Sequence, residues 1–376
     1  MTAGRDNKIV VVASLGDSLV TFRGDLLRQM RQRGWRVRAL APELTEPTKN
    51  WLVEQGVEFV EAPLSRTGTS VSDDVRYLAW LYGEIAEFGP DIVLAYTVKP
   101  VVYALLASAF RRSVRRYALI TGLGYAFADG SPQRKRIRNV VELLYRAALR
   151  KADLVFFQNP DDEALFRTRH LLRETTPSMV VAGSGIDVDQ FSVVPLPRNH
   201  VVFILIARLL GDKGVREFVQ ALRIVRAKHP NVVGRLVGWI DTNPDAIQPQ
   251  ELEAWIAQGD VEYLGRLRDV RPAISEASVY VLPSYREGTP RTVLEAMAMG
   301  RPIITTDAPG CRETVIHGVN GLLVPVRSVV ELASAMERFV VEPDLARTMG
   351  ERSRERAEAK YDVRRVSATM LDAMGI

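Results

Sequence analysis

The chain has 376 residues, of which 47% are hydrophobic and 25% charged, a composition that excludes a disordered protein and suits two globular domains. Its one cysteine, Cys311, excludes an intrachain disulfide, and we interpret it as a structural residue. The apolar runs at residues 101–110 and 117–128 are shorter than the roughly 20 residues that a bilayer requires, so we expect a cytoplasmic protein that is not integral to a membrane.

Short β-branched runs alternate with helix-length segments in the first half of the chain. The expected strands span residues 8–14, 37–41, 58–62, 91–97, 116–121, 154–159 and 179–182. The expected helices span residues 21–33, 73–88, 100–110, 133–151 and 161–171. This alternation predicts βαβ units and a parallel sheet.

Two prolines in residues 192–199 (SVVPLPRN) interrupt the pattern, because proline cannot continue a helix or a central strand. A second series of expected strands follows at residues 200–207, 232–238, 261–264, 278–283, 302–306 and 321–324. Helices are expected between these strands and at residues 329–341, 344–360 and 363–374. The chain is therefore expected to be an α/β protein with two Rossmann-like, doubly wound domains that face each other across a cleft. We place the first domain at residues 1–193 and the second at 194–360, with a C-terminal helix at 361–376 that packs back on the first.

Positive charge is concentrated between Arg111 and Lys151. This segment holds eleven basic and two acidic residues, a net charge of +9, whereas the whole chain has a net charge of +5. Such a segment predicts an anionic partner, and an anionic membrane surface is the preferred one. The segment lacks the interleaved aromatic residues of a known nucleic-acid module, so no nucleic-acid partner is expected.

The stretch at residues 279–307, VYVLPSYREGTPRTVLEAMAMGRPIITTD, predicts a strand, a polar loop and then a helix that starts near Arg291. Pro290 suits the first turn of a helix, and the exposed N–H groups of a helix start favour a phosphate. Glu287 in the loop and Glu295 in the helix are placed to accept hydrogen bonds from sugar or ribose hydroxyls.

A second loop, IARLLGDKG at residues 206–214, follows the first strand of the second domain and holds Arg208 and Lys213. Arginine can bind phosphate oxygens through two N–H groups at once, and lysine adds a point charge. The pair could neutralise a diphosphate without a metal ion, so neither a metal nor another cofactor is expected.

Together these motifs resemble the retaining glycosyltransferases of family 4, which have the GT-B fold. Arg208 and Lys213 match the family's diphosphate-binding pair, and Glu287 with Glu295 matches its E-x7-E motif. The resemblance implies catalytic roles for Glu287, Arg208 and Lys213, with Glu287 at the transferred sugar and Glu295 at the ribose. The remaining donor-binding residues that it implies are Gly16, Leu264, Thr289, Pro290 and Arg291.

The chain is most similar to the subgroup that builds bacterial surface glycans on a polyprenyl-diphosphate carrier, including N-acetylgalactosamine transferases. The stretches that carry this likeness are TFRGDLL (21–27), YTVKP (96–100), ITGLGYAF (120–127) and APGCRETV (308–315). The resemblance implies a UDP-sugar donor, a lipid-linked saccharide acceptor and a peripheral site on the cytoplasmic face of the inner membrane. The implied acceptor-binding residues are Phe22, Arg23, Lys99, Thr121, Gly122, Leu123 and Gly124.

Two other functions stay open at this point. A nucleotide-sugar epimerase can have the same two-domain fold, and a non-catalytic protein could bind a nucleotide sugar within a glycan assembly complex. The D-x-D sequence at Asp187–Asp189 has the form of a metal site, but it lies away from the expected donor loop and is interpreted as structural.

Overall fold

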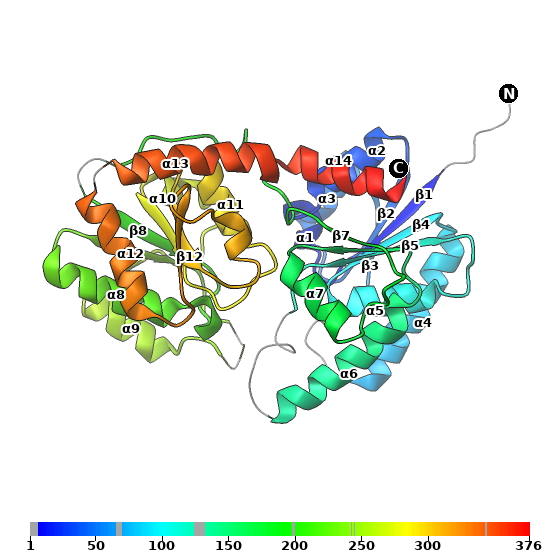
Figure 1. Ribbon diagram of the computed structural model, residues 1–376. Helices are drawn as coiled ribbons and strands as arrows, with labels where there is room; N and C mark the ends of the chain where they lie inside the picture. Colours follow the sequence, from blue (N-terminus) through cyan, green and yellow to red (C-terminus); the bar gives the residue numbers. More distant parts are fainter. Residues whose placement is uncertain are drawn as a thin grey trace. The chain divides into compact units, whose positions relative to one another are not determined.

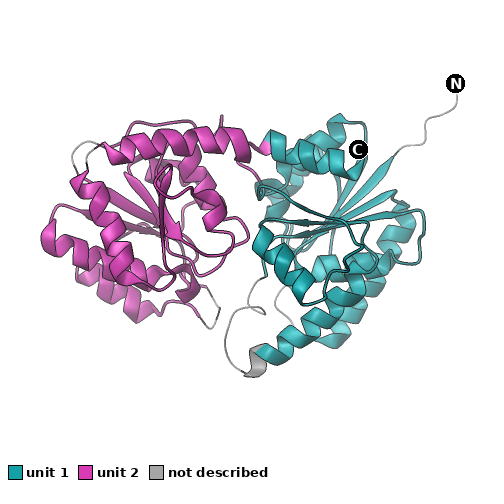
Figure 2. Cartoon of the chain, in the orientation of Figure 1, with its two compact units in different colours: residues 1–184, 364–376 teal, residues 185–363 magenta. Residues whose placement is uncertain are grey.

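The computed structural model describes residues 7–64, 70–123, 132–197, 200–241, 243, 245–342 and 344–376, with the side chains of helix α6 described from Lys135 onward. The chain forms two compact units, which Figure 2 distinguishes by colour. Unit 1 comprises residues 1–184 and 364–376, and unit 2 comprises residues 185–363.

Unit 1 alternates strands and helices along the chain (Figure 1). Its elements are β1 (Lys8–Val12), α1 (Asp17–Thr21), α2 (Gly24–Gln32), β2 (Arg36–Ala41), α3 (Glu46–Glu54), β3 (Glu58–Glu61), α4 (Val71–Phe88), β4 (Ile92–Tyr96), α5 (Val98–Ala107), β5 (Arg115–Ile120), α6 (Pro132–Leu149), β6 (Leu154–Phe157), α7 (Pro160–Thr168), β7 (Ser178–Val180) and the C-terminal α14 (Val363–Met374).

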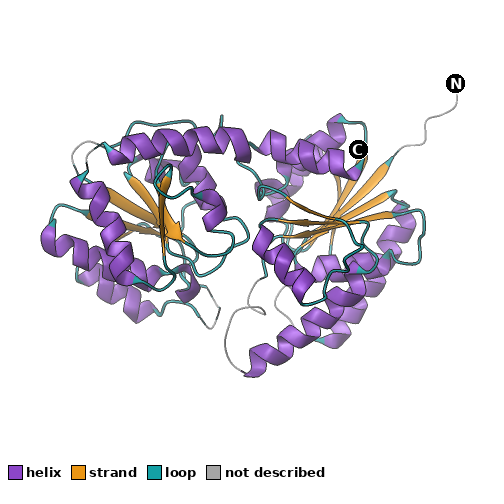
Figure 3. Ribbon diagram, in the orientation of Figure 1, coloured by secondary structure: helices purple, strands orange, loops and turns teal. Residues whose placement is uncertain are grey.

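The strands of unit 1 form one parallel sheet in the order β3-β2-β1-β4-β5-β6-β7. Successive side chains of a strand point to opposite faces, and here both faces are covered by helices. Val10 and Val12 belong to a core with α4, α5, α6 and α7. Ile9 and Val11 belong to a second core with α1, α2, α3 and α14. The continuous apolar runs of the sequence follow from this burial on two sides (Figure 3).

Unit 2 repeats the same plan with a sheet in the order β10-β9-β8-β11-β12-β13, in which all the pairs are parallel. Its strands are β8 (Val202–Ile206), β9 (Val233–Val237), β10 (Glu262–Tyr263), β11 (Val279–Leu282), β12 (Ile303–Thr306) and β13 (Gly321–Val324). Its helices are α8 (Val215–Lys228), α9 (Pro249–Ala257), α10 (Arg271–Ser275), α11 (Arg291–Ala298), α12 (Val329–Val341) and α13 (Leu345–Arg356), with 3₁₀ turns η2 (Gly211–Lys213) and η3 (Arg312–Thr314) and a π-helical turn η4 (Ala357–Tyr361). The prediction of two α/β, doubly wound domains is confirmed.

The expected helix at residues 21–33 is wrong in its start. The chain forms α1 and α2 instead, separated at Phe22 and Arg23, where Arg23 has φ −128° and ψ 2°. The next residue, Gly24, lies against the Trp51 ring, and a Cβ there would come within 3.2 Å of it. The sequence prediction also missed α3, whose first turn contains Pro47.

The boundary between the units falls at Ser184 and Gly185, earlier than the expected boundary after residue 193. Residues 185–191 belong to unit 2 because backbone and side-chain hydrogen bonds tie them to its last helices. Ile186 N donates to Tyr361 O over 2.7 Å, and Arg354 donates to the carbonyl oxygens of Val188 and Phe191. The second crossing lies between Val363 and Arg364, so nearly all of α14 belongs to unit 1.

Candidate functional site

The strand order of unit 2 reverses between β8 and β11, which are neighbours in the sheet. In open α/β sheets, ligands bind outside the carboxyl ends of the strands at such a reversal. The loop after β8 carries Arg208 and Lys213, and the loop after β11 carries Glu287. The topology therefore brings the two predicted motifs to the same edge of one sheet, although 74 residues separate Lys213 from Glu287.

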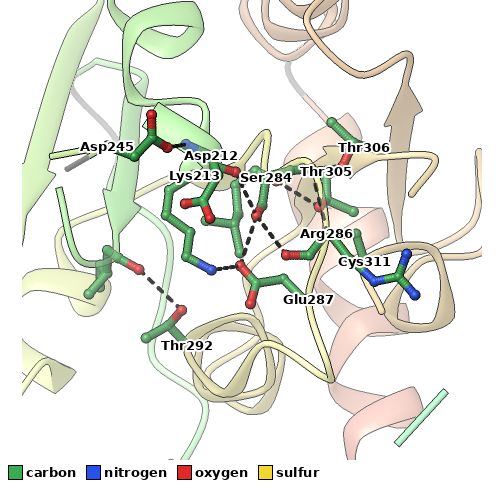
Figure 4. A network of polar contacts seen from close by, with 12 residues as sticks. Asp212, Lys213, Asp245, Ser284, Arg286, Glu287, Thr292, Thr305, Thr306 and Cys311 are labelled. Atoms are coloured by element: carbon green, nitrogen blue, oxygen red, sulfur yellow. Dashed lines mark hydrogen bonds and ion pairs between the residues drawn. The ribbon is translucent and has the colours of Figure 1, made fainter. Parts of the chain in front are cut away.

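Lys213 and Glu287 form an ion pair, which Figure 4 shows within a wider polar network. The same Glu287 oxygen, Oε1, accepts a hydrogen bond of 2.8 Å from Ser284 Oγ. Burial on its own lowers the pKa of Lys213, but the carboxylates of Glu287 and Asp212 outweigh it and raise the pKa above its usual value. Lys213 is therefore a permanent cation at neutral pH, held at a fixed point beside Glu287.

The loop that carries Glu287 is fixed by close backbone packing. Glu287 N donates to Pro309 O over 2.9 Å. Gly310 has φ +78°, and a Cβ there would lie 2.1 Å from the carbonyl oxygen of Glu287. Only glycine allows this approach. Cys311, the next residue, is buried, and burial raises the pKa of its thiol to about 12, which agrees with the structural interpretation.

Helix α11 begins at Arg291 directly after this loop, as predicted, with Pro290 as its N-cap residue and no side-chain cap. An uncapped helix start presents N–H groups and a positive dipole end to an anion. Arg291 and Glu295 form an ion pair of 3.0 Å one turn apart. Burial raises the pKa of Glu295, against the opposing effect of Arg291.

Arg208 lies on the loop after β8, and its Nη1 is 2.9 Å from Asp241 Oδ2. Its side chain is 39% exposed, so the guanidinium is accessible at the sheet edge. Leu264, a predicted donor contact, is 38% exposed directly after β10. Two residues further on, the Arg266 guanidinium lies 4.5 Å from the centre of the Trp239 ring. The carboxyl ends of β8, β9 and β10 are therefore followed by Arg208, Trp239 and Leu264, respectively.

Within unit 1, the predicted acceptor residues follow β1, β4 and β5, which are neighbours in the sheet. Phe22 is 39% exposed, whereas Arg23 is 3% exposed and stacks on Tyr96 with its guanidinium carbon 5.3 Å from the ring centre. Lys99 forms an ion pair of 2.8 Å with Asp74. Arg23 thus contacts the protein core as well as lying near the strand ends.

The three described residues that follow β5 have different environments. Thr121 is partly exposed, Gly122 has φ +135°, and Leu123 is 3% exposed and belongs to the core. Gly124 lies outside the described residues. Leu123 packs in the core of unit 1, and its expected contact with the acceptor stays a prediction.

Gly16 is needed for the packing of unit 1 itself. It is buried, and a Cβ there would lie 2.7 Å from the carbonyl oxygen of Glu43. The close approach that glycine permits is therefore one between two loops of unit 1. Its expected contact with a diphosphate stays a prediction.

Sequence reasoning missed four polar residues that support the motif side chains: Ser284, Asp212, Asp241 and Asp245. Asp212 N donates to Asp245 Oδ2 over 2.9 Å, and Asp212 O accepts from Tyr285 N over 2.8 Å. Asp241 and Asp245 stand two residues on either side of Asn243, and such spacing of Asp and Asn favours turns. That pattern was the available sequence signal.

The described part of the chain contains no group of three or more His, Cys, Asp or Glu side chains that could hold a metal ion. The D-x-D segment forms a turn, because Asp187 Oδ1 accepts hydrogen bonds from the backbone N–H groups of Asp189 and Gln190, each over 3.0 Å. This geometry agrees with the structural interpretation of the segment.

Solved structures identify the architecture as the GT-B fold of glycosyltransferases. Sucrose-phosphate synthase from Thermosynechococcus elongatus superposes with a TM-score of 0.80 at 20% identity, over 98% of each chain. HepE from Anabaena, in a complex with UDP, superposes with a TM-score of 0.77 at 19% identity, over 98% of this chain and 99% of that one.

Two family descriptions match the sequence and between them cover most of it. Residues 19–183 match a glycosyl transferase 4-like domain, and residues 200–341 match the glycosyl transferases of group 1. Both descriptions are of glycosyltransferase domains, so the chain is a glycosyltransferase. A relative from Campylobacter jejuni is 25% identical over 351 residues, which are 90% of each protein, and is named N,N'-diacetylbacillosaminyl-diphospho-undecaprenol alpha-1,3-N-acetylgalactosaminyltransferase.

Proposed function

We propose that the protein transfers a hexose or N-acetylhexosamine from a UDP-sugar to a saccharide carried on a polyprenyl diphosphate, with retention of the anomeric configuration. The observation that carries the donor site is the meeting of Arg208, Lys213 and the start of α11 where the strand order of unit 2 reverses. The Campylobacter jejuni relative, whose name specifies a lipid-diphosphate acceptor and N-acetylgalactosamine transfer, supports the acceptor class and the sugar.

In the proposed reaction, the bond between the anomeric carbon and the β-phosphate oxygen breaks, and a bond to the acceptor hydroxyl oxygen forms. Negative charge grows on the departing diphosphate, where Arg208, Lys213 and the helix start stabilise it. The acceptor attacks from the face that the diphosphate leaves, and a phosphate oxygen takes the hydroxyl proton. Glu287, paired with Lys213, accepts a hydrogen bond from a hydroxyl of the transferred sugar. Because the protein's cations carry the phosphate charge, transfer is proposed to need no metal.

The basic segment is the proposed contact with the inner face of the membrane. Part of its charge serves the fold, since Arg116 is 8% exposed and donates to the carbonyl oxygens of Ser108 and Arg111. Among the described residues of the segment, the exposed cations are Arg112, Lys135, Arg136, Arg150 and Lys151. Two apolar side chains of α6, Val140 at 58% and Leu143 at 62%, are exposed along with them. Of these cations, Lys135 and Arg136 lie on α6 itself, and a helix that exposes both cations and apolar side chains can rest on an anionic surface.

Within the described residues no helix is both long and apolar enough to cross a membrane. Association with a surface therefore rests on the exposed cations and apolar side chains of the segment. Binding to phosphatidylglycerol vesicles should fall as salt rises and should weaken in Lys135→Glu/Arg136→Glu. Binding that is indifferent to both changes would refute the membrane contact.

The test of the enzyme is an assay of UDP-N-acetylgalactosamine, UDP-N-acetylglucosamine and UDP-galactose against an undecaprenyl-diphosphate-linked disaccharide, with and without EDTA. Lys213→Ala and Glu287→Gln should remove most transfer, whereas Lys228→Ala, an exposed lysine paired with Glu337, should keep it. Conversion of a donor without acceptor would instead indicate an epimerase. Donor binding with no product across several lipid-linked acceptors would indicate a non-catalytic partner.

A further inference from the structure

The loop between β9 and α9 lies along the loop that carries Arg208 and Lys213. Leu209 N donates to Trp239 O over 3.0 Å, and Ile247 N donates to Leu209 O over 2.9 Å. Further along, Gly211 N donates to Asp245 O over 2.8 Å. These backbone hydrogen bonds fix the segment between Arg208 and Lys213 to the β9–α9 loop.

Asp241 connects this loop to Arg208 through its side chain. Its Oδ2 is 2.9 Å from Arg208 Nη1, and its Oδ1 accepts a hydrogen bond of 3.1 Å from Asn243 N. The carboxylate is thus fixed to its own loop by one oxygen and holds the guanidinium with the other. Asn243 in turn accepts a hydrogen bond of 3.0 Å from Asp245 N, which joins the two acidic residues in one turn.

An arginine guanidinium is planar and carries five N–H donors, so the direction in which it is held decides which of them face a ligand. A contact through Nη1 leaves the Nε and Nη2 edge of the plane for a phosphate. A 39% exposed arginine without such a contact would sample many rotamers and lose that freedom on binding.

We propose that Asp241 is a positioning residue, which holds the Arg208 guanidinium in the orientation that binds the donor diphosphate. This inference rests on the proposed function, because it assumes that Arg208 binds the donor. It means that the β9–α9 loop contributes to donor recognition through Arg208. An ordinary surface ion pair would make no such contribution.

The alternative is that Asp241 competes with the donor for Arg208. The fixed carboxylate argues for positioning, since Asp241 is bonded to Asn243 N and its loop is bonded along residues 209–211. A competitor would have to withdraw from Arg208 when the donor binds. The two roles predict opposite changes in affinity when the carboxylate is removed.

The test measures UDP binding by calorimetry in the wild type, Asp241→Asn, Arg208→Ala and the double variant. Asparagine keeps a side-chain oxygen for Asn243 N and replaces Oδ2, the oxygen that accepts from Arg208, with an NH2 group that carries no charge and cannot accept. We expect Arg208→Ala to weaken UDP binding about 10- to 100-fold and Asp241→Asn about 3- to 10-fold. Because Asp241 acts through Arg208, the double variant should bind within about twofold of Arg208→Ala.

Asp245→Asn is the matched control, since it changes a carboxylate of the same loop that bonds the backbone N–H of Asp212. Its effect should be the same whether or not Arg208 is present. Additive effects of Asp241→Asn and Arg208→Ala, or tighter UDP binding by Asp241→Asn, would overturn the positioning role and leave the donor site intact. Full UDP affinity in Arg208→Ala would overturn the donor site as proposed, and the role of Asp241 with it.

Discussion

The replacement of Lys213 by methionine tests the stability of the candidate site as well as its chemistry. Methionine keeps most of the length of the side chain but removes the charge that neutralises Glu287, whose side chain is 16% exposed. The carboxylate would keep its hydrogen bond from Ser284 Oγ and lose its cation. Removing one partner of a buried ion pair costs about 3–5 kcal/mol. Because Glu287 keeps some exposure, the expected loss of stability is at the lower end, about 3 kcal/mol.

A loss of about 3 kcal/mol in a unit of this size should lower the unfolding midpoint by about 6–12 °C. Lys213→Met/Glu287→Gln should melt above Lys213→Met, because glutamine removes the charge left without a partner. Lys228→Met is the control, since the pair of Lys228 with Glu337 is more exposed and should change the midpoint by no more than about 3 °C. Calorimetric melting that shows Lys213→Met within about 2 °C of the wild type would refute the reasoning.

Three further substitutions test buried groups of unit 2. Burial raises the pKa of Glu295 above its usual value of 4.5, so its carboxylate should take up a proton on mild acidification. The affinity for UDP-N-acetylgalactosamine should then fall in the wild type and stay flat in Glu295→Gln. Equal pH profiles of the two proteins, measured by calorimetry, would contradict this. Arg301 is fully buried and donates to five carbonyl oxygens. Arg301→Met should therefore lower the free energy of unfolding by about 3 kcal/mol, measured by urea titration. An unchanged urea midpoint would contradict this prediction. Gly310→Ala should displace the Glu287 backbone and reduce transfer. The control is Gly318→Ala, at φ +80° with open space around its Cβ, which should cost only about 1–2 kcal/mol of backbone strain and keep transfer. Equal losses of transfer activity in the two variants would contradict the packing argument.

The parallel sheets could be predicted from the sequence because both faces of each strand are buried, which produces continuous apolar runs. The start of α11 could also be predicted, from a strand, a polar loop and Pro290 in succession. The pairing of Lys213 with Glu287 could not be read from spacing alone, since it depends on β8 and β11 lying side by side. The resemblance named both residues and gave no reason for their contact.

The missed features have a common cause, since each depends on contacts between segments far apart in the chain. The break at Phe22 and Arg23 is followed by Gly24, which packs against Trp51 of α3. The assignment of residues 185–191 to unit 2 reflects hydrogen bonds to Tyr361 and Arg354. Asp241 and Asp245 resemble ordinary turn residues until the β9–α9 loop is seen along the loop of Arg208. Local propensity contains no information on such partners.

Unit 2 is a single uninterrupted stretch of the chain, and its first and last residues are in contact. Ile186 O accepts a hydrogen bond of 3.0 Å from Val363 N, and Ile186 N donates one to Tyr361 O, so hydrogen bonds fasten the two ends of unit 2 together. A fragment of residues 185–363 keeps that fastening and should be obtainable as an autonomous domain. Unit 1 is built from two pieces, and its final helix contributes Met370, Leu371 and Met374 to the core. Removal of that helix would therefore expose the apolar side chains of unit 1 that these three residues cover. Limited proteolysis near both residue 184 and residue 363 should therefore release residues 185–363 as a stable domain and leave an N-terminal portion prone to aggregate.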